Sequence, residues 1–459
     1  MAFKDQRLAF ELDDQALQVR ATPYAGVPLV AELFRVRETA AAIDKYVELK
    51  SRRRGLRASE LVESLLLLWS VGGERCEDVE LLRADEALSG LVGHAFPAPQ
   101  TARDFLDRFH MEDLPLLQQG DSASVREESS GLKGLGRVVA HTLAYGQALS
   151  NATRATLDVD ATILASSKRE ARMTFKGMTG YQPVVVLWAE QDLVVADEFR
   201  DGNVPAGSGN LRVVQRAMEQ LPEAVSERYL RGDSALYEHD LMDWLDEQDV
   251  QFAISADMSR ELRTAIAALD ESEWHEERDE GDAVRAWAEV AFVPHDKRHR
   301  KNGPVRRYLA VRILKKQGAL FADGSDRKHF AVVTNREGDG LELLRWHRQK
   351  AGTIEPAHHV LTNELAAEAL PSKRFGANAA WFRLNTLLYN LLSLLRRTAL
   401  PDDLQRARPK RLRFLCFNVL GQLVQHARER LLRLAARARA LIDRARLALR
   451  GPPRPLLGD

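Results

Sequence analysis

The order in which strands and helices are predicted between residues 153 and 256 leaves few folds open to this chain. The segment begins with RATLDVDATIL, a β-branched run whose alternating character is typical of a strand. Two further apolar runs, YQPVVVLWAE (181–190) and DLVVADEFR (192–200), follow with a short connection between them. A connection this short makes neighbouring strands an antiparallel hairpin. The segment therefore opens with a meander of three antiparallel strands.

The pattern then changes to alternating helices and strands. A helix is predicted over 211–222, a strand ending in an acid over 228–233, a helix over 237–248 and a strand over 250–256. Strands separated by helices pair in parallel, because the helix carries the chain back across one face of the sheet. An antiparallel meander followed by this parallel alternation is the order of a ribonuclease H-like mixed α/β sheet.

The rest of the chain divides around that segment, and 459 residues are too many for one ordinary core. Residues 257–336 contain strand-like runs separated by charged, glycine-containing turns, which predicts a mainly β insertion. Helical patterns resume after it. We therefore expect a helical N-terminal region (1–150), a first core segment (151–256), the β-rich insertion (257–336), a second core segment (337–400) and a basic helical C-terminal region (401–459).

Charge is distributed unevenly, although the formal net charge is zero. From residue 396 to the end, sixteen Lys or Arg stand against five Asp or Glu, an excess of eleven positive charges. Such asymmetry is expected where one end of a protein meets nucleic-acid phosphate, and it makes Lys410, Arg411 and Arg413 candidates for DNA contact. A solvated Arg-rich helix explains the same composition.

The N-terminal region carries a second candidate for DNA contact. In PAPQTARDFLDRF (97–109), Thr101 followed by Asp104 is a helix-start signal after two prolines. A short helix in this setting is typical of a recognition helix, with Arg103 and Arg108 facing DNA. Small helical domains look similar without DNA. The polar segment 119–133 predicts a linker or an exposed loop.

Several protein classes are disfavoured by composition. No apolar run is long enough for a membrane span, and the first residues lack the apolar core of a signal peptide. The two cysteines, Cys76 and Cys416, lie far apart without metal-ligand spacing. They argue against a disulfide scaffold or a zinc finger and fit the reducing cytoplasm.

The acids of the core are the candidate catalytic residues. Asp158 and Asp160 stand at i and i+2 in the first strand and therefore point to the same face. Burying two like charges there is costly without a cation or partners. Asp233 ends a strand of the parallel part, where ligands usually bind, although an aspartate there is often only a turn former or helix cap. Two Mg²⁺ ions about 3.5–4 Å apart, held by such carboxylates, assist in-line attack on a phosphodiester.

Five segments, taken in order, carry a family resemblance: LDVDAT, YLRGDSALY, HFAVVTN, HRQKAGTIEPAHHVLTNEL and LPSKRFGANAAWFRLNTLLYNLL. Together they resemble the bacterial insertion-sequence transposases with a DDE domain of the group-1 type. The resemblance runs from GGERCEDVELLRADEAL to RLRFLCFNVLG, which is nearly the whole chain. It implies a helical N-terminal DNA-binding region, a ribonuclease H-like core, and a β-rich insertion before the last catalytic helix.

The resemblance also implies the catalytic residues. The family's D-x-T motif matches Asp160 to Thr162, so Asp160 is the first acid and Asp158 a neighbour that orients a ligand or a metal-bound water. Asp233 is the second acid and Glu355 the third. The gap of 122 residues between them is accounted for by the insertion. Two Mg²⁺ or Mn²⁺ ions would be held by these three carboxylates.

The segment around Glu355 departs from the family pattern. Related transposases often carry a Tyr or Arg before the glutamate and a Lys seven residues after it, but here the latter position is Thr362. Arg348 and Lys350 are the nearby cations that can contact the DNA backbone instead. Because Pro356 cannot lie inside a helix, we expect a break at 351–353, with Thr353 capping a new helix that has Glu355 in its first turn.

Other polar and aromatic residues near Glu355 have simpler interpretations. His358 and His359 are adjacent and point in different directions on a helix, so we expect them to contact phosphate or cap a surface instead of binding metal. Trp381 and Phe382 can stack on a flipped base, but they fit a helix core as well. The remaining acids of the segment are expected to be solvated helix-face charges, namely Glu342, Glu364 and Glu368.

The resemblance implies a transposase that binds terminal inverted repeats, frees a 3′-hydroxyl and directs it at target DNA. Pairing of two double-stranded DNA ends implies at least a dimer, and we expect a cytoplasmic, DNA-associated bacterial protein. A ribonuclease H-like nuclease without strand transfer would use the same acids. A catalytically decayed DNA-binding protein would keep the fold and lose turnover, and Thr362 and Pro356 are the features that favour it.

Overall fold

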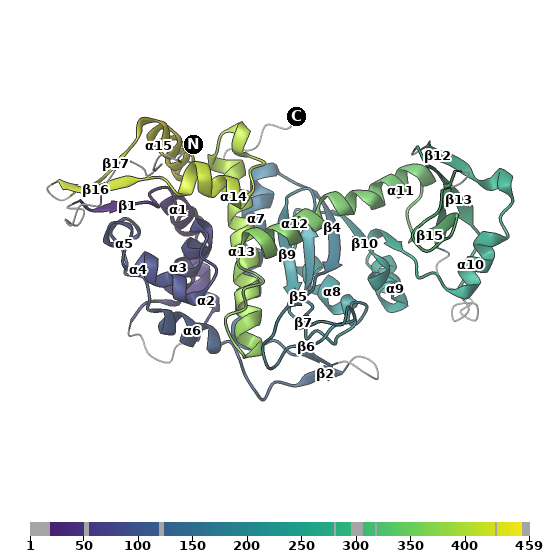
Figure 1. The fold of residues 1–459 in the computed structure, drawn as a ribbon, viewed down its shortest axis with the longest axis horizontal. Coiled ribbons are helices and arrows are strands. Elements are labelled where there is room, and N and C mark those ends of the chain that lie inside the picture. Colours follow the sequence, from purple (N-terminus) through teal and green to yellow (C-terminus); the bar gives the residue numbers. More distant parts are fainter. Residues whose placement is uncertain are drawn as a thin grey trace, which may run out of the picture.

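The computed structural model of this chain describes residues 19–49, 55–118, 124–279, 281–294, 306–316, 319–426 and 429–451. Its centre is a mixed sheet in which five strands have the order β9-β8-β4-β10-β11 (Figure 1). β8 pairs antiparallel with both β4 and β9, whereas β10 pairs parallel with β4 and β11. The bounds are β4 (Arg154–Ala161), β8 (Val184–Trp188), β9 (Leu193–Glu198), β10 (Glu227–Gly232) and β11 (Gln251–Ser255). The predicted ribonuclease H-like strand order is confirmed.

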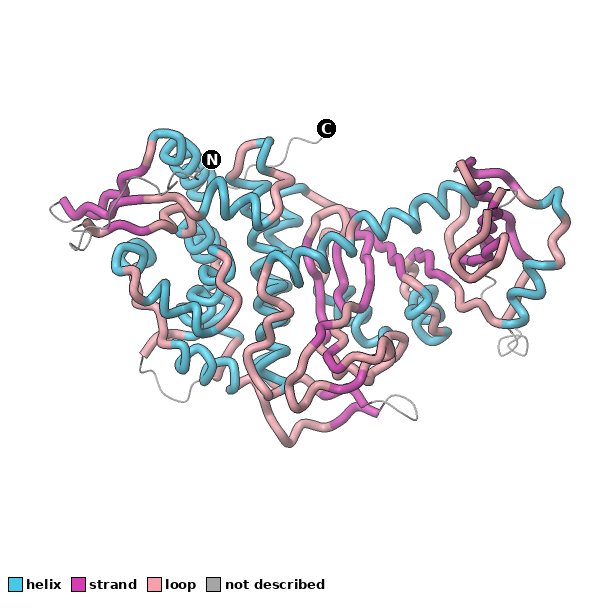
Figure 2. The backbone as a smooth tube through the Cα atoms, in the orientation of Figure 1, coloured by secondary structure: helices cyan, strands magenta, loops and turns pink. Residues whose placement is uncertain are grey.

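The predicted β insertion is confirmed, and it continues the same sheet. Its last strand, β15 (Arg327–Thr334), pairs antiparallel with β11 of the core. Three more strands follow outward, so that nine strands form one hydrogen-bonded sheet. They are β14 (Arg307–Lys315), β13 (Ala283–Val290) and β12 (His275–Asp279). Figure 2 shows these strands at the far right, beside the helix α10 (Arg260–Ala267).

Two long helices build the centre of the hydrophobic core. α7 (Ser130–Ser150) and α13 (Phe375–Ala399) pack against each other and against β9. The side chains of Trp381 and Phe382 on α13 are fully buried, and the Trp381 indole donates to the Ala366 carbonyl. Their core interpretation is therefore correct. Two further helices of the core, α8 (Asn210–Gln220) and α9 (His239–Glu247), follow β9 and β10 in the chain.

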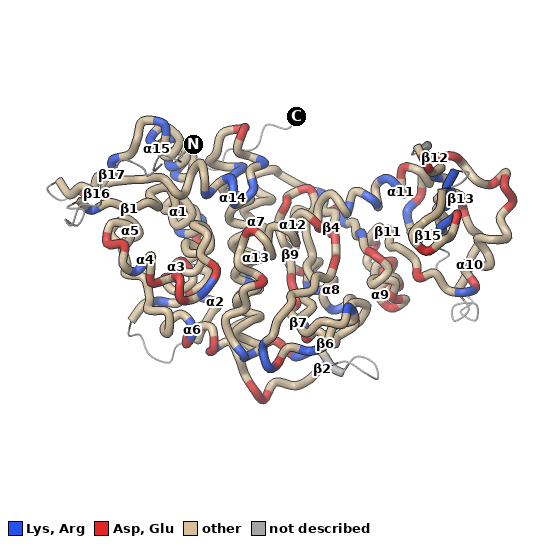
Figure 3. Tube along the Cα trace, viewed as in Figure 1, with Lys and Arg blue, Asp and Glu red and all other residues tan. Residues whose placement is uncertain are grey.

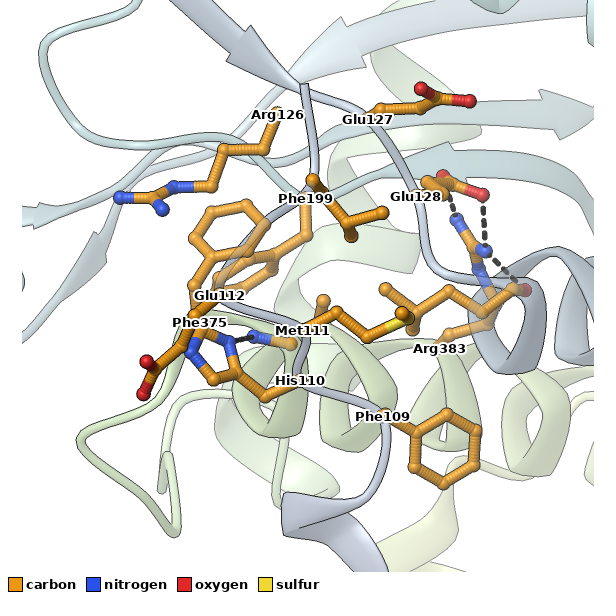
Figure 4. A pocket seen from close by; sticks show the side chains of 14 residues that line it. Phe109, His110, Met111, Glu112, Arg126, Glu127, Glu128, Phe199, Phe375 and Arg383 are labelled. Atoms are coloured by element: carbon orange, nitrogen blue, oxygen red, sulfur yellow. Dashed lines mark hydrogen bonds and ion pairs between the residues drawn. The ribbon is translucent and has the colours of Figure 1, made fainter. Parts of the chain in front are cut away.

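Buried charges fix α13 to the sheet. Arg383 donates to Asp197 of β9 and to both oxygens of Glu128, beside a pocket lined by Phe109 and Phe375 (Figure 4). Burial alone would raise the pKa of Glu128, but Arg383 and Arg216 lower it to about 2. The segment before α7 is therefore bound into the core. The predicted linker at 119–133 is wrong for its described part, since β3 (Ser124–Arg126) and the start of α7 occupy it.

The N-terminal region is mainly helical, as predicted. One of its helices begins at Pro99 with Ala98 as N-cap, so Thr101 lies inside the helix and is not its start. Proline fits the first helical position because its missing N–H would have no partner there. The helices that precede α7 are α1 (Pro28–Val36), α2 (Thr39–Tyr46), α3 (Ala58–Val71), α4 (Val79–Arg83), α5 (Glu86–Val92) and α6 (Pro99–Asp107).

The C-terminal region is not wholly helical, which corrects the prediction. β16 (Gly421–His426) and β17 (Glu429–Leu434) form a hairpin, and β16 also pairs with β1 (Ala21–Thr22). Only α15 (Ala436–Arg450) is the predicted Arg-rich helix, and it packs against α1 and α13. Figure 1 shows this hairpin beside the N-terminal helices. No described helix combines the length and apolar character that crossing a membrane requires.

Candidate active site

Asp160 lies at the end of the central strand β4. Alternate residues of this strand, such as Leu157 and Val159, are buried in the apolar core. Asp158 and Asp160 point to the opposite face because side chains alternate along a strand. The side chain of Asp160 keeps 21% of its surface exposed. Solvent can therefore reach Asp160 at the C-terminal end of β4, although β4 is an interior strand of the sheet.

Asp233 comes directly after β10, the strand parallel to β4. Gly232 is paired with Val159, so the next residues along the two strands are Asp233 and Asp160. One oxygen of Asp233 accepts the N–H of Ala235 at 3.0 Å and caps the turn at Ser234–Leu236. Asp233 is thus a turn-capping residue and also a neighbour of Asp160.

Glu355 reaches the site from a helix that starts late. α11 (Gly340–Arg348) runs from the insertion back to the core and ends in a tight turn over Gln349–Gly352 (Figure 1). α12 (Ile354–His359) then begins after Thr353, with Glu355 exposed in its first turn. The predicted helix break is confirmed. Pro356 is tolerated because first-turn N–H groups have no partner within a helix.

Thr353 differs from the prediction in what its hydroxyl contacts. It makes no capping bond to α12, and instead it hydrogen-bonds Asp158 and lies 2.9 Å from the Lys350 carbonyl. The start of the Glu355 helix is therefore attached to the face of β4.

Asp158 is fully buried and paired with a cation. Arg231 of β10 donates to both of its carboxylate oxygens and also to the Trp346 carbonyl of α11. Asp158 therefore connects β4, β10 and the start of α12. The Arg231 partner was not apparent from the sequence.

The three predicted acids influence one another electrostatically. Burial raises the pKa of Asp160 to about 6. Lys350 opposes the shift, whereas the negative charges of Asp233 and Glu355 add to it. Like charges disfavour a second ionised carboxylate nearby. The structure therefore brings Asp160, Asp233 and Glu355 into one negative region.

Lys350 and Arg348, the two cations expected to contact the DNA backbone, have different partners in the structure. The Lys350 ammonium lies 3.8 Å from Oδ1 of Asp160, inside the site. Arg348 instead donates to both oxygens of Glu277 in β12, which directs its guanidinium toward the insertion. Thr162 lies two residues after Asp160, and its backbone N–H donates to the Pro183 carbonyl.

His358 is a site residue that sequence reasoning missed. Its imidazole is buried, and Nε2 lies 3.6 Å from Oδ2 of Asp160. Burial, assisted by Lys350, lowers the pKa of His358 to about 4, so the ring is neutral. His359 faces away and lies 3.9 Å from Glu364. No signal in the sequence indicated His358 in particular, because His358 and His359 follow Glu355 by three and four residues and both spacings make helical neighbours.

A groove extends from Asp233 along the insertion. It is lined by Arg348 and His347 of α11 and by apolar side chains of the insertion sheet that include Ile313 and Phe330. The groove connects the acidic region with the outer strands.

The residues predicted to contact DNA differ in their surroundings. Arg103 pairs with Glu77, whereas Arg108 is exposed at the end of α6. Lys410 and Arg411 are exposed on α14 (Pro409–Leu412), in a basic stretch visible in Figure 3. Arg413 instead donates to backbone carbonyls, including that of Trp69 at 2.8 Å, so its guanidinium is bound within the protein. Glu364 is buried and accepts the Lys410 N–H, so it is not a solvated charge.

The carboxylates of Asp160, Asp233 and Glu355 are chemically suited to bind a divalent cation. The negative charges of Asp233 and Glu355 act on Asp160, a bound cation would balance them, and carboxylate oxygens are the ligands that Mg²⁺ prefers. Within the described ranges, no three His, Cys, Asp or Glu side chains stand close enough together to hold an ion as they lie.

A sheet of this strand order, with an aspartate closing its first strand and another following its fourth, is the arrangement of ribonuclease H-like nucleic-acid enzymes. The chain belongs to the family Transposase DDE domain group 1, which matches residues 19–441. The match includes the helical N-terminal region, the insertion and the C-terminal hairpin as well as the core.

Among solved structures, the chain is similar to the piggyBac transposase in its synaptic complex with hairpin DNA. The TM-score is 0.43 and the identity 11%, over 80% of this chain and 74% of that chain. No curated protein matches the sequence.

Proposed function

We propose that this protein cleaves DNA at the ends of a mobile element and joins the freed ends to target DNA, with Asp160, Asp233 and Glu355 as its catalytic acids. The observation that carries the proposal is their shared negative region at the ends of β4 and β10. Family membership supports the reaction class.

Each acid reaches the proposed site in a different way. β4 and β10 fix Asp160 and Asp233 in register, whereas Glu355 depends on the contact between Thr353 and Asp158. Two bound Mg²⁺ or Mn²⁺ ions would activate the attacking oxygen and stabilise the leaving oxygen. Lys350 would bind a phosphate oxygen beside Asp160, which supplies positive charge where the phosphodiester reacts.

Basic side chains outside the site would hold the duplex. Lys410, Arg411 and Arg108 are exposed, and α15 adds further arginines such as Arg437. Contacts of this kind position the backbone without reading sequence and make binding sensitive to salt. Joining two element ends would require at least two protomers in the active complex.

A strand-transfer assay tests the proposal. A labelled duplex from the sequence flanking the gene, carrying its terminal repeat, is incubated with protein and Mg²⁺ or Mn²⁺ and a target plasmid. We expect the wild type to join the labelled end to the plasmid and Asp233→Asn to bind the duplex without cutting. Asp240→Asn, an exposed aspartate on α9, is the matched control and should remain active.

The other outcomes identify the alternatives. Cleavage without joining would indicate a ribonuclease H-like nuclease. Binding without cleavage by the wild type, with either metal, would overturn the catalytic assignment and indicate a decayed DNA-binding protein.

A further inference from the structure

We propose that His358 is a metal ligand of this site and that its Nε2 binds the same divalent ion as Oδ2 of Asp160. The inference rests on the metal-dependent chemistry proposed above and adds a nitrogen donor to the three carboxylates. It departs from the expectation, drawn from two adjacent histidines, that neither would bind metal.

The first support is the environment of the imidazole. His358 is nine-tenths buried, and neither ring nitrogen has a hydrogen-bond partner among the described residues. Buried polar groups are nearly always hydrogen-bonded, because a buried group without a partner has lost its contact with water and gained nothing in return. The ring therefore lacks a partner that a bound cation would provide.

The second support is the distance between the two donor atoms. Nε2 of His358 lies 3.6 Å from Oδ2 of Asp160, which is too long for a hydrogen bond. Two ligand atoms that each lie about 2.1 Å from one ion, at angles of about 90–120°, are about 3.0–3.6 Å apart. The observed separation is at the upper end of that range. The Lys350 ammonium lies 3.8 Å from the other oxygen, Oδ1.

The third support is the position of His358 on its helix. It follows Glu355 by three residues on α12, a spacing at which helical side chains are neighbours, with Glu355 exposed and His358 buried beneath it. A Glu-x-x-His pair on one helix is a known way to present a carboxylate and an imidazole to a metal pair. Imidazole binds Mn²⁺ and later transition metals more readily than it binds Mg²⁺. A histidine ligand would therefore shift the metal preference of the site toward Mn²⁺.

Pulsed electron paramagnetic resonance of Mn²⁺ bound to the full-length protein tests this without any mutation. We expect nitrogen modulation from a directly bound ¹⁴N, and we expect it to change to the ¹⁵N pattern when only histidine is labelled with ¹⁵N. The same measurement on His358→Gln should lose the nitrogen signal. His359→Gln, the neighbouring histidine that faces Glu364, is the matched control and should keep it.

Calorimetric titration adds a readout of affinity. We expect His358→Gln to weaken Mn²⁺ binding by roughly tenfold or more and Mg²⁺ binding by less, with His359→Gln unchanged. Mn²⁺ binding that Asp160→Asn abolishes, but that shows no nitrogen coupling in the wild type, would overturn the histidine ligand and leave the carboxylate site intact. No Mn²⁺ binding to the wild type, with or without a DNA end, would overturn the metal step of the proposed function as well.

Discussion

Arg231 donates hydrogen bonds to both carboxylate oxygens of Asp158, from Nε to Oδ1 at 2.6 Å and from Nη2 to Oδ2 at 2.8 Å. The two residues are paired across β10 and β4, and both are almost completely buried. Removing the guanidinium would leave a buried carboxylate without its cation. We therefore expect Arg231→Met to lower the free energy of unfolding by about 3–5 kcal/mol, as measured by urea denaturation.

Replacing both members of the pair is the control. Arg231→Met combined with Asp158→Asn should recover most of the loss, because no buried charge then remains. A loss below about 1 kcal/mol for Arg231→Met alone, the size of a surface ion pair, would show that the interaction does not stabilise the sheet.

The hydroxyl of Thr353 connects Asp158 with the start of the helix that carries Glu355. Thr353→Val keeps the shape of the side chain and removes this hydrogen bond, so the position of Glu355 becomes less well defined. We expect its strand-transfer rate to fall by about tenfold to a hundredfold at unchanged DNA affinity, since small misplacements of a catalytic group are costly. Thr353→Ser keeps the hydroxyl and should retain most of the rate. Equal losses in both variants would exclude the hydroxyl as the cause.

The raised pKa of Asp160 makes the free energy of unfolding of the metal-free protein depend on pH. Its pKa is about 6 in the folded chain, against 3.8 for an ordinary aspartate, so the folded state holds this proton more tightly than the unfolded state does. Its contribution is therefore most favourable below pH 3.8 and is lost as the pH rises through 6. At pH 8, Asp160→Asn should be more stable than the wild type by up to about 3 kcal/mol.

Chemical denaturation of both proteins between pH 4 and pH 8, with a chelator present, measures that difference. The gap should close toward pH 4. A difference that does not vary with pH would mean that Asp160 is not destabilised by charge, and Asp240→Asn provides the reference for an exposed aspartate.

Replacing Lys350 is expected to slow DNA cleavage much more than replacing Arg348, although the two residues lie only two positions apart. Lys350 is beside Asp160, and its loss removes positive charge from the reacting phosphate. We expect Lys350→Met to lower the cleavage rate by about a hundredfold, as for other groups that stabilise transition-state charge. Arg348 is paired with Glu277 of the insertion, so Arg348→Met should change cleavage by much less. The reverse order of effects in a single-turnover assay would contradict this assignment.

The central sheet could be predicted because each strand is a separate apolar run bounded by turn signals. β8 and β9 were recognisable as a hairpin, and the alternation around β10 and β11 indicated parallel pairing. The C-terminal hairpin could not be predicted in the same way. The two arginines of β17, Arg430 and Arg433, stand three residues apart, which is helical spacing. Its partner β16 also pairs with β1, some 400 residues earlier in the chain. The strand structure of the hairpin therefore depends on its pairing with distant residues and not on local sequence.

The site was predictable only in part, for a similar reason. Asp233 and Glu355 follow from local signals and family pattern, and Pro356 correctly indicated a late helix start. Nothing local distinguishes His358 from His359, because their burial depends on how α12 packs on β4. The pairing of Arg231 with Asp158 likewise depends on strand register.

The shared sheet also limits how the protein could be shortened. β11 is an interior strand only because β15 of the insertion covers its outer side. A chain in which 257–336 were replaced by a short loop would expose the backbone N–H and C=O groups of β11, an apolar strand, along an open edge. Such edges pair readily with strands of other molecules and cause aggregation. The insertion thus protects the central sheet from aggregation by covering β11. A family member without the insertion would need a bulge, a lysine or a covering helix at this edge.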